Sequence, residues 1–359
     1  MTCTTHKTCM THTTCKTKPE SPFTDEALLH YIKTSDTAES AALFKQARKV
    51  KETRYGNAVY FRGLIEFTNY CKNDCYYCGI RKSNKKVQRY RLSTAEILDC
   101  CRIGDKLGYK TFVLQGGEDP YFTDERMLEL INAIRRDYPA HAISLSIGER
   151  PRASYEAFFA AGANRYLLRH ETASVEHYRK LHPPRMSLEE RKQCLYWLKE
   201  TGYHAGAGFM VGSPFQEPEN LLADLRFLEE LRPQMVGIGP FIPQSDTPFG
   251  AYPAGNLDLC LRMIALTRLL LPDALLPATT ALGTISPQGR ELGLAAGANV
   301  VMLNISPQST RKLYALYDNK ICTGEKAAEC LLCMKTRLHA SGFTPDMSRG
   351  DPPANRKAG

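Results

Sequence analysis

The chain has 359 residues, a formal net charge of +9 and a hydrophobic fraction of 43%. This is enough apolar material for a buried core, and the length fits one large domain or two ordinary ones. No run approaches the roughly 18 uninterrupted apolar residues of a membrane-spanning helix, and the N-terminus lacks the apolar core of a signal peptide. We therefore expect a cytoplasmic protein with no membrane partner. The positive charge suits an anionic ligand but does not by itself indicate nucleic-acid binding.

Residues 1–20 differ from the rest of the chain. Cys3, His6, Cys9, His12 and Cys15 recur every third residue in a threonine-rich background. This spacing fits a labile metal-binding tail. It also fits a disordered extension, because nothing hydrophobic in the segment would order it. We expect the disordered extension.

From residue 24 to 51, apolar residues at helical spacing predict two helices, divided near residues 35–36. Strand-like apolar runs then alternate with helix-length segments. The predicted strands lie at 58–67, 111–115, 142–146, 165–170, 205–210, 235–240, around 276–279, and at 300–303. The predicted helices between them include 93–107, 123–137, 188–201, 217–231 and 257–271.

The joints between these segments repeat. Gly108, Gly162, Gly202 and Gly297 each end a helical segment just before a strand, where a left-handed cap favours glycine. The sequence Ala-Gly-Ala-Asn occurs at both 161–164 and 296–299. Eight such units predict a parallel α/β fold, a (β/α)8 TIM-type barrel, with an open doubly wound sheet as the alternative. We expect one barrel domain over 21–345, with leading helices and a C-terminal helical, cysteine-bearing segment at 322–333. Residues 346–359 are expected to be a flexible tail.

A compact cysteine motif, Cys71-Lys-Asn-Asp-Cys75-Tyr-Tyr-Cys78, follows directly on the first predicted strand. In a chain without a signal peptide, grouped cysteines indicate metal or redox chemistry before disulfides. Four thiolates complete a closed electron-transfer cluster, whereas three leave one iron open to a further ligand. The motif therefore predicts a [4Fe-4S] cluster, in preference to a zinc site with a distant fourth ligand.

This triad resembles the signature of the radical S-adenosylmethionine (SAM) superfamily. The resemblance implies that the amino and carboxylate groups of SAM chelate the open iron. An electron from the cluster then breaks a sulfonium bond and releases a 5′-deoxyadenosyl radical. Gly116, Gly117 and Glu118 resemble the motif that receives the SAM amino group, since glycine permits close approach and a carboxylate suits an ammonium. Tyr77 resembles the aromatic residue that packs near the adenine.

Further stretches resemble one branch of the superfamily, the [FeFe]-hydrogenase maturases called HydE. The resemblance runs from about residue 24 to 343, while the Cys/His tail has no counterpart in the family pattern. The matching stretches are 90–93, 113–120, 165–172, 236–243 and 277–284, together with Tyr314-x-x-Tyr317 ahead of Cys322.

The resemblance also implies ligand-contacting residues. Gln115, Ser146, Glu171 and Arg191 would help to hold SAM, with the Arg191 guanidinium suited to a carboxylate. Read alone, Arg191 would be a solvated charge on a helix. The residues implied to line the substrate side of the cavity are Arg169, Thr279, Thr280, Met302, Tyr314 and Tyr317. Taken alone, the two tyrosines and Met302 would be core packing.

A second cysteine set, Cys322, Cys330 and Cys333, resembles the auxiliary Fe–S site found in part of this family. We expect an accessory [2Fe-2S] or [4Fe-4S] cluster there. Zinc is the main rival, because thiolates at such spacing serve either metal. The remaining cysteines outside the tail fall in helical segments and are expected to be buried packing residues: Cys100, Cys101, Cys194 and Cys260.

The resemblance implies a step in assembly of the hydrogenase active-site cluster. The substrate would be a small anionic iron complex that carries cysteine, carbon monoxide and cyanide. A tyrosine-lyase maturase would supply it, a scaffold GTPase maturase would receive the product, and a ferredoxin or flavodoxin would serve as reductant.

Other functions fit parts of the sequence. A methylornithine-synthase-like mutase is weakened by the C-terminal cysteines and the Thr279-Thr280 pair, and a biotin-synthase-like sulfur inserter lacks candidate cysteines at the strand ends. A non-catalytic iron–sulfur carrier leaves the Gly-Gly-Glu motif and Glu171 without a role. A nucleic-acid-modifying enzyme would need an appended recognition module, for which the segment after Gly342 is too short.

Overall fold

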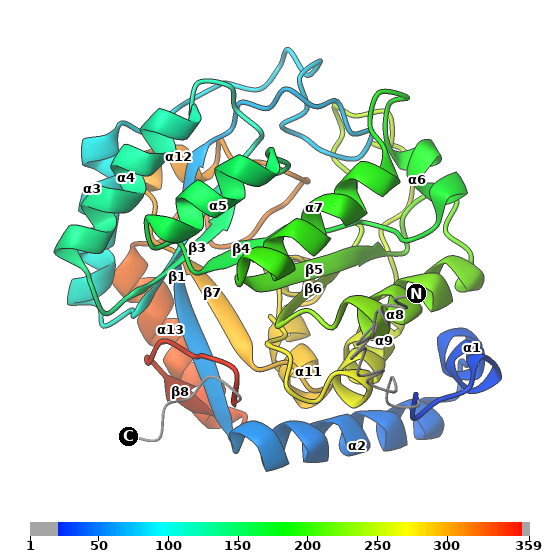
Figure 1. Ribbon diagram of the computed structural model, residues 1–359. Coiled ribbons are helices and arrows are strands. Elements are labelled where there is room, and N and C mark those ends of the chain that lie inside the picture. The colour runs from blue at the N-terminus through cyan, green and yellow to red at the C-terminus, as the bar shows by residue number, and fades with distance from the viewer. Residues whose placement is uncertain (1–20, 354–359) are drawn as a thin grey trace, which may run out of the picture.

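A computed structural model describes residues 21–353, and its centre is one parallel sheet curved into a barrel (Figure 1). The strand order is β6-β5-β4-β3-β2-β1-β7, with β8 also paired to β1. The strands are β1 (Ala58–Thr68), β2 (Thr111–Gly116), β3 (Ala142–Ser146), β4 (Arg165–Leu167), β5 (His204–Val211), β6 (Met235–Pro240), β7 (Val300–Asn304) and β8 (Thr344–Asp346). The predicted α/β TIM-type fold is confirmed.

The ring between β6 and β7 closes through a short extended segment instead of a full strand. Leu275 bridges Met235 of β6, and Pro277 bridges Val300 of β7. The sequence predicts a strand around 276–279, and the structure reduces it to these two bridges. The physical reason is Pro277, which has no N–H to donate and so interrupts a ladder of hydrogen bonds.

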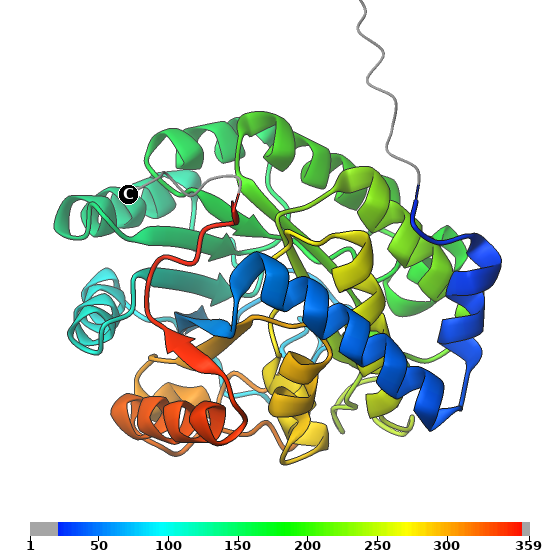
Figure 2. The ribbon, with the colours of Figure 1, turned by 90° about the horizontal axis from the view of Figure 1, so that it is seen from below.

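Helices cover the outside of the barrel (Figures 1 and 2). The two predicted leading helices are α1 (Asp25–Lys33) and α2 (Thr37–Tyr55), divided at 34–36 as expected. The others are α3 (Thr94–Lys106), α4 (Asp124–Asp137), α5 (Arg152–Ala160), α6 (Val175–Leu181), α7 (Leu188–Thr201), α8 (Pro218–Leu231), α9 (Leu257–Leu270), α10 (Thr280–Ile285), α11 (Gly289–Ala295), α12 (Gln308–Arg311) and α13 (Ala327–Ala340). The four predicted packing cysteines, Cys100, Cys101, Cys194 and Cys260, are buried in α3, α7 and α9.

The two Ala-Gly-Ala-Asn sequences adopt the same local structure at two helix-to-strand joints. Gly162 and Gly297 have φ values of 108° and 111°, which glycine adopts without steric cost. The side-chain oxygen of Asn164 then accepts from the Ile143 N–H at 3.1 Å, and that of Asn299 accepts from the Leu276 N–H at 2.8 Å. Each repeat therefore ends a helix and fastens the incoming strand to its neighbour.

The C-terminal segment lies across the N-terminal end of the barrel, next to α2 (Figure 2). The sequence predicts a flexible tail from 346, whereas Asp346 pairs with Tyr60 in the sheet. Asp351 lies 2.7 Å from the guanidinium of Arg165, which is fully buried. Residues 346–353 are therefore part of the fold. The predicted Cys/His tail, 1–20, lies outside the described residues.

None of the helices within residues 21–353 is long and apolar enough to cross a membrane. The C-terminal ends of the strands lead into loops at the top of the molecule in Figure 1, and the cysteine motif lies in one of these loops. This is the end at which barrels of this type carry their reactive groups.

Candidate functional site

The loop that follows β1 carries Cys71, Cys75 and Cys78, each partly buried. Burial raises the pKa of all three thiols, to about 12 at Cys78. Cys71 also raises the pKa of Cys75 and Cys78, and Cys78 raises that of Cys75, because neighbouring thiolates repel one another. The loop therefore gathers three sulfurs whose charges need a cation to compensate them.

Arg89, which the sequence does not single out, organises this loop. Its guanidinium donates to the carbonyl oxygens of Asn69 and Ile80 at 2.5 and 2.8 Å. It also donates to those of Arg81 and Asn84 at 2.6 and 3.2 Å. Four carbonyls thus converge on one cation, and its charge lowers the pKa of Cys71 and Cys78 against the effect of burial. A planar guanidinium suits this task better than an ammonium.

Asn69 fixes the start of the same loop. Its side-chain amide donates to the carbonyl oxygens of Gln88 and Leu313 at 2.9 and 2.8 Å, and its oxygen accepts from the Tyr90 N–H at 2.8 Å. The side chain is fully buried, so these bonds are shielded from water. Arg89 and Asn69, which are not predicted ligands of the cluster, therefore both hold the cysteine loop in place.

Between residues 21 and 353, no group of three or more His, Cys, Asp or Glu side chains is arranged to hold a single metal ion. A tetrahedral zinc site needs such convergence, with Zn–S distances of about 2.3 Å. In a [4Fe-4S] cluster each thiolate binds a different iron, so the sulfurs lie farther apart. Three thiols on one loop match the three protein ligands of a cluster whose fourth iron stays open.

The Gly-Gly-Glu motif lies against this loop. A Cβ added at Gly117 would approach the Tyr70 carbonyl oxygen to 2.1 Å, so only glycine fits there. The Glu118 side chain is nearly buried, with Oε2 3.3 Å from Lys72 Nζ and Oε1 4.0 Å from Arg191 Nη2. Glu118 Oε2 is buried without a hydrogen-bond partner in the described structure, which leaves an acceptor for a ligand amine.

Arg191 is not the solvated helix charge that its sequence context alone suggests. The residue is 8% exposed, and its Nε lies 2.5 Å from Oε1 of Glu149. Glu149, which the sequence does not single out, is itself buried enough that its pKa is raised. The guanidinium faces Glu118 as well, so it joins two carboxylates at the side of the cysteine loop.

Tyr77 is held by a histidine that the sequence also does not single out. His182 Nδ1 lies 3.0 Å from the Tyr178 carbonyl oxygen, and Nε2 lies 3.1 Å from the Tyr77 hydroxyl. Burial lowers the pKa of His182 to about 3, so the ring is neutral. Because a carbonyl only accepts, Nδ1 carries the proton and Nε2 accepts the Tyr77 hydroxyl hydrogen. The Tyr77 ring is therefore fixed beside Cys78.

A cavity of about 200 Å³ opens beside Tyr77 and Cys78. The predicted residues that line it are Tyr77, Cys78, Arg169, Glu171, Thr279, Thr280 and Tyr317. The Thr279 hydroxyl is buried without a hydrogen-bond partner in the described structure. Arg169 Nη2 lies 2.9 Å from Glu171 Oε2, but without hydrogen-bond geometry. Polar groups with unused hydrogen-bonding capacity thus face the cavity.

The backbone at Glu171 is strained. Its φ is 66°, a left-handed conformation that costs a non-glycine residue about 1–2 kcal/mol. Two bonds hold it there: the Glu171 N–H donates to Gly208 O at 3.0 Å, and the Met210 N–H donates to Glu171 O at 3.2 Å. Strain of this kind is typical of functional positions, and here it turns the carboxylate into the cavity.

A smaller cavity adjoins the first. Thr280 lines both, and the second contains Met302, Glu66, Lys320 and Cys322. Glu66 is 1% exposed, and burial raises its pKa even though the Lys320 ammonium lies 2.5 Å away. Asn304 donates to the other Glu66 oxygen at 2.6 Å. Glu66, Asn304 and Lys320 are further polar residues that the sequence does not single out.

The second cysteine set lies at the end of this smaller cavity. Cys322 has a φ of 60° and lies beside Cys330 of α13, whose thiol donates to it. This hydrogen bond lowers the pKa of Cys322 to about 6 and raises that of Cys330. Cys333, one turn along α13, is exposed. Two of the three predicted ligands are therefore in contact, while the third lies at the surface.

Of the ligand-contacting residues that the HydE resemblance implies, four line neither cavity: Gln115, Ser146, Arg191 and Tyr314. Gln115 hydrogen-bonds with Tyr314, whose ring is buried. Ser146, at the end of β3, pairs with Gln115 in the sheet, and Arg191 lies on the Glu118 side of the site. The geometry divides the predicted set into a Glu118 side, a Tyr77–Thr279 cavity and a Thr280–Cys322 cavity.

Comparison with known proteins decides the family. A sequence profile of the radical SAM superfamily matches residues 65–228. The chain is also 46% identical over 328 residues to the [FeFe] hydrogenase maturase subunit HydE of Thermotoga maritima, a match that covers 91% of this chain and 93% of that protein. The chain belongs to the radical SAM superfamily, in its HydE branch.

Two further relatives are similar to this radical SAM enzyme. The 3-methylornithine synthase of Methanosarcina barkeri is 32% identical over 306 residues, which cover 84% of this chain and 85% of that protein. The crystal structure of methylornithine synthase (PylB) superposes with a TM-score of 0.81 at 30% identity, and covers 90% of this chain and 94% of that one. The parallel α/β barrel is thus the shared fold.

Membership of the superfamily implies a [4Fe-4S] cluster and SAM. The residues present fit both groups. Three thiols on one loop leave a fourth cluster position open, and Gly117 keeps the neighbouring backbone clear of side-chain atoms. The unused acceptor of Glu118 and the guanidinium of Arg191 match the ammonium and carboxylate ends of an amino acid.

Proposed function

We propose that this enzyme acts in assembly of the [FeFe]-hydrogenase active-site cluster, on a small cysteine-bound iron carbonyl and cyanide complex. The observation that carries the proposal is the 46% identity to HydE, which extends over nearly the whole of both chains. The superfamily segment at 65–228 ends before Thr279, Thr280, Tyr317 and the second cysteine set, which complete the two cavities.

In this proposal Cys71, Cys75 and Cys78 hold the [4Fe-4S] cluster, and the Glu118–Arg191 side binds the amino-acid end of SAM. When bound, the cluster supplies the electron that splits SAM into methionine and a 5′-deoxyadenosyl radical. Tyr77 and Glu171 line the same cavity as Cys78, so they orient the adenosyl end of SAM toward the cavity. The Thr279 hydroxyl and Arg169 guanidinium face the remaining space, where they suit an anionic substrate.

Substrate supply and product removal follow from the same proposal. A tyrosine-lyase maturase would supply the iron complex, and a scaffold GTPase maturase would accept the product. A ferredoxin or flavodoxin would provide the reducing electron. Cys322, Cys330 and Cys333 would hold an accessory Fe–S cluster, since Cys322 and Cys330 already lie side by side at the smaller cavity.

Anaerobic reconstitution with iron and sulfide, followed by dithionite and SAM, tests the chemistry. We expect 5′-deoxyadenosine or an adenosylated product from the parent and none from Cys75→Ser. Adding the product of a tyrosine-lyase maturase should increase turnover, and the mixture should activate a hydrogenase in the presence of the scaffold maturase. An assembled and reducible cluster that does not cleave SAM would contradict the proposal.

A second candidate is an amino-acid mutase like 3-methylornithine synthase, favoured by the 32% identity and by the TM-score of 0.81. The same reconstituted enzyme, incubated with candidate amino acids, should then form 3-methylornithine, which mass spectrometry would detect. We expect none, because Lys320 and the second cysteine set fill the end of the cavity with polar groups.

A further inference from the structure

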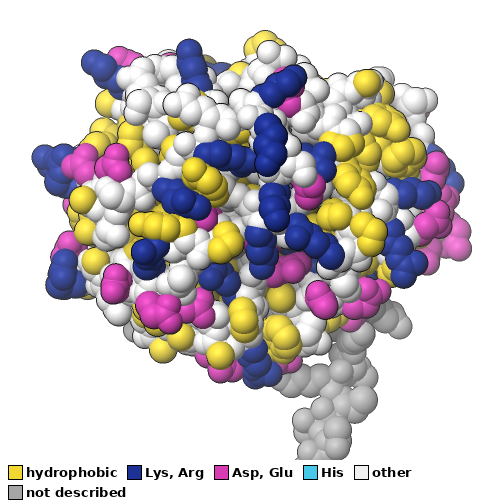
Figure 3. Space-filling view, turned by 90° about the horizontal axis from the view of Figure 1, so that it is seen from above, with side chains coloured by type: hydrophobic (Ala, Val, Ile, Leu, Met, Phe, Trp, Pro, Cys, Tyr) yellow, Lys and Arg dark blue, Asp and Glu magenta, His cyan; other side chains and the backbone are white. Residues whose placement is uncertain are grey.

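The two segments that enclose the cysteine loop carry an excess of positive charge. The exposed cations of residues 71–86 and 175–186 form a surface that we call the basic face: Lys72, Lys82, Lys85, Arg179, Lys180 and Arg185, with Lys86 paired to Asp246 at its edge. Figure 3 shows Lys and Arg side chains gathered in the middle of the upper surface. The acidic groups within these segments are already paired: Asp74 with Arg81, and Glu176 with Lys180. Lys72 lies 3.3 Å from Glu118, so the cations of the face that lack an ion pair within residues 21–353 are Lys82, Lys85, Arg179 and Arg185.

One contact joins the two segments of the basic face: Arg185 donates to the carbonyl oxygen of Lys72. Within the first segment, the Lys82 N–H donates to the carbonyl oxygen of Asn73 at 2.8 Å. Lys82 and Lys85 are exposed, and neither has a side-chain ion pair within the described part of the chain. The Lys82 and Lys85 ammonium groups therefore stabilise no part of the described fold through an ion pair.

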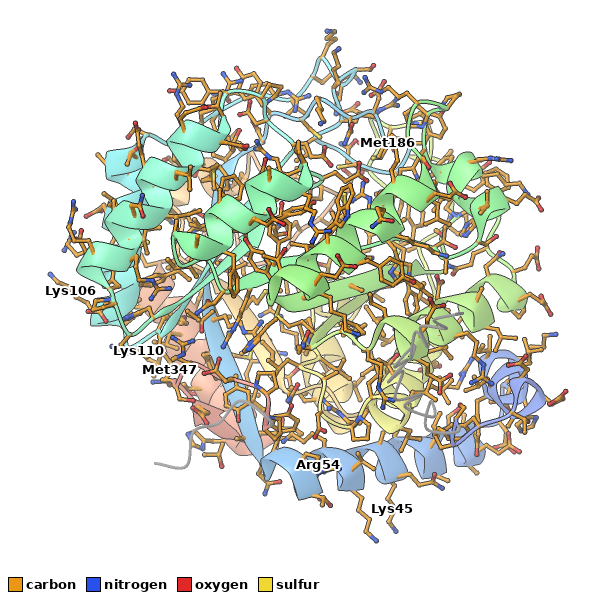
Figure 4. The ribbon with its side chains drawn as sticks, in the orientation of Figure 1. Lys45, Arg54, Lys106, Lys110, Met186 and Met347 are labelled. Atoms are coloured by element: carbon orange, nitrogen blue, oxygen red, sulfur yellow. The ribbon has the colours of Figure 1, made fainter. Side chains whose placement is uncertain are left out.

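Met186 connects this face to the cysteine loop. Its sulfur lies 3.9 Å from Sγ of Cys75, and its side chain is partly exposed. It lines a surface groove together with Val175, Arg179 and Pro184. Figure 4 places Met186 at the top of the molecule, between α6 and α7. One side chain thus separates a predicted cluster ligand from the surface.

An exposed aromatic ring adjoins the same face. Phe215 is 48% exposed, has a φ of 64°, and has the Lys180 ammonium 5.9 Å from its ring centroid. Its ring packs on Phe249, which packs on Tyr76 of the cysteine loop, with centroid distances of 6.1 and 6.0 Å. A bulky residue in a left-handed conformation is an outlier, and here the strain presents an apolar ring to solvent beside the cations.

We propose that the basic face, with Phe215 at its margin, is the docking surface for a small acidic protein that carries one electron at a time. This inference rests on the proposed function, because it concerns reduction of the cluster that Cys71, Cys75 and Cys78 would hold. One electron passes from the reduced carrier to the cluster, so the carrier is oxidised by one electron and no bond or proton changes place. Complementary charge accelerates such encounters, and electron-transfer interfaces are characteristically small.

The test uses reduced flavodoxin as the probe and the cluster-loaded full chain. The variant is Lys82→Glu with Lys85→Glu. Its matched control is Lys45→Glu with Lys49→Glu, on the exposed side of α2 at the opposite end of the barrel (Figure 4). Both pairs change the net charge equally. The readout is the rate of cluster bleaching on mixing with flavodoxin, which needs no SAM cleavage, and the same rate with dithionite.

At about 0.05 M salt we expect the K82E/K85E variant to be reduced by flavodoxin at least about tenfold more slowly than the control. The difference should shrink at about 0.5 M salt, where charges are screened, and both variants should react with dithionite like the parent. Phe215→Asn, which retains a residue tolerant of this backbone conformation, should weaken flavodoxin binding at both salt concentrations.

Equal rates for the two charge variants with flavodoxin would overturn the inference. An equal loss with flavodoxin and dithionite would overturn it as well, since the lysines would then act on the cluster itself. Failure of the proposed function is distinguishable: SAM would remain uncleaved although flavodoxin reduces the cluster at a rate that depends on Lys82 and Lys85.

Discussion

Lys320 Nζ donates to Oε1 of Glu66 at 2.5 Å, although 254 residues separate the two in the sequence. Both groups are nearly enclosed, with side-chain exposures of 11% and 2%. The same ammonium donates to the Tyr314 carbonyl oxygen at 3.0 Å. One ion pair at the smaller cavity therefore fastens the Tyr314–Cys322 segment to the first strand.

Breaking this pair should be costly. Glu66→Gln or Lys320→Met alone leaves one buried charge without its partner, and each should lower the free energy of unfolding by about 3 kcal/mol. The double variant should lose much less than the sum, because neither charge remains. Denaturant unfolding of all four proteins gives the coupling energy. Strict additivity would show that the pair contributes nothing.

Arg89 should be required for cluster assembly. Replacing it with methionine removes a cation that holds four loop carbonyls, and lysine cannot reproduce the planar fork. We expect both variants to bind less than about half of the parent's iron and sulfide after reconstitution. Arg102→Met, which removes an exposed guanidinium paired with Asp99 on α3, is the control and should load fully.

Glu171 tests whether backbone strain accompanies function. Glu171→Gly relieves a φ of 66° but removes the Arg169 ion pair, so the melting temperature should change little. The SAM dissociation constant should rise at least about tenfold, the effect of roughly one lost charge-assisted hydrogen bond. Arg232→Gly, at a φ of 48° on the surface, is the matched control: it should raise the melting temperature and leave SAM affinity unchanged. Unchanged SAM affinity in the Glu171 variant would remove this residue from the binding site.

Asp351 should contribute stability that depends on pH. Burial opposes its ionisation, yet the hydrogen bond from Arg165 holds its pKa below the ordinary value. A carboxyl group with a depressed pKa stabilises the fold above its unfolded pKa of about 3.9, and this stability is lost as the pH falls through the folded pKa. Asp351→Asn should therefore cost about 2–3 kcal/mol near pH 7, and the difference from the parent should shrink below about pH 4. Thermal unfolding across this range measures it; a constant difference would contradict the ion-pair explanation.

The second cysteine set should be accessory. In a Cys322→Ser, Cys330→Ser variant we expect lower iron content, while 5′-deoxyadenosine formation with dithionite stays within about twofold of the parent. Iron analysis and product chromatography on the same preparation measure both quantities. Loss of SAM cleavage in a fully folded variant would show that this set takes part in the reaction.

The sequence by itself determined the fold class and the main cysteine loop. Alternating apolar runs predict strands that agree with β3 and β6 at both ends, and the repeated Ala-Gly-Ala-Asn predicts repeated joints. These features are local: a glycine with positive φ, or a run of buried β-branched residues, carries its own conformational preference. Local spacing likewise groups Cys71, Cys75 and Cys78.

Only the tertiary structure decided which partners these residues have. Nothing in the sequence joins Arg89 to the Asn69 carbonyl, Glu149 to Arg191, or Glu66 to Lys320, because each pair meets across the barrel end or between distant segments. The same holds for residues 346–353. The sequence predicts a flexible tail there, but in the structure Asp351 pairs with the buried Arg165. A buried charge needs a partner of opposite charge or a hydrogen-bonding group. The fold decides which distant segment supplies that partner, and local sequence patterns do not encode this choice.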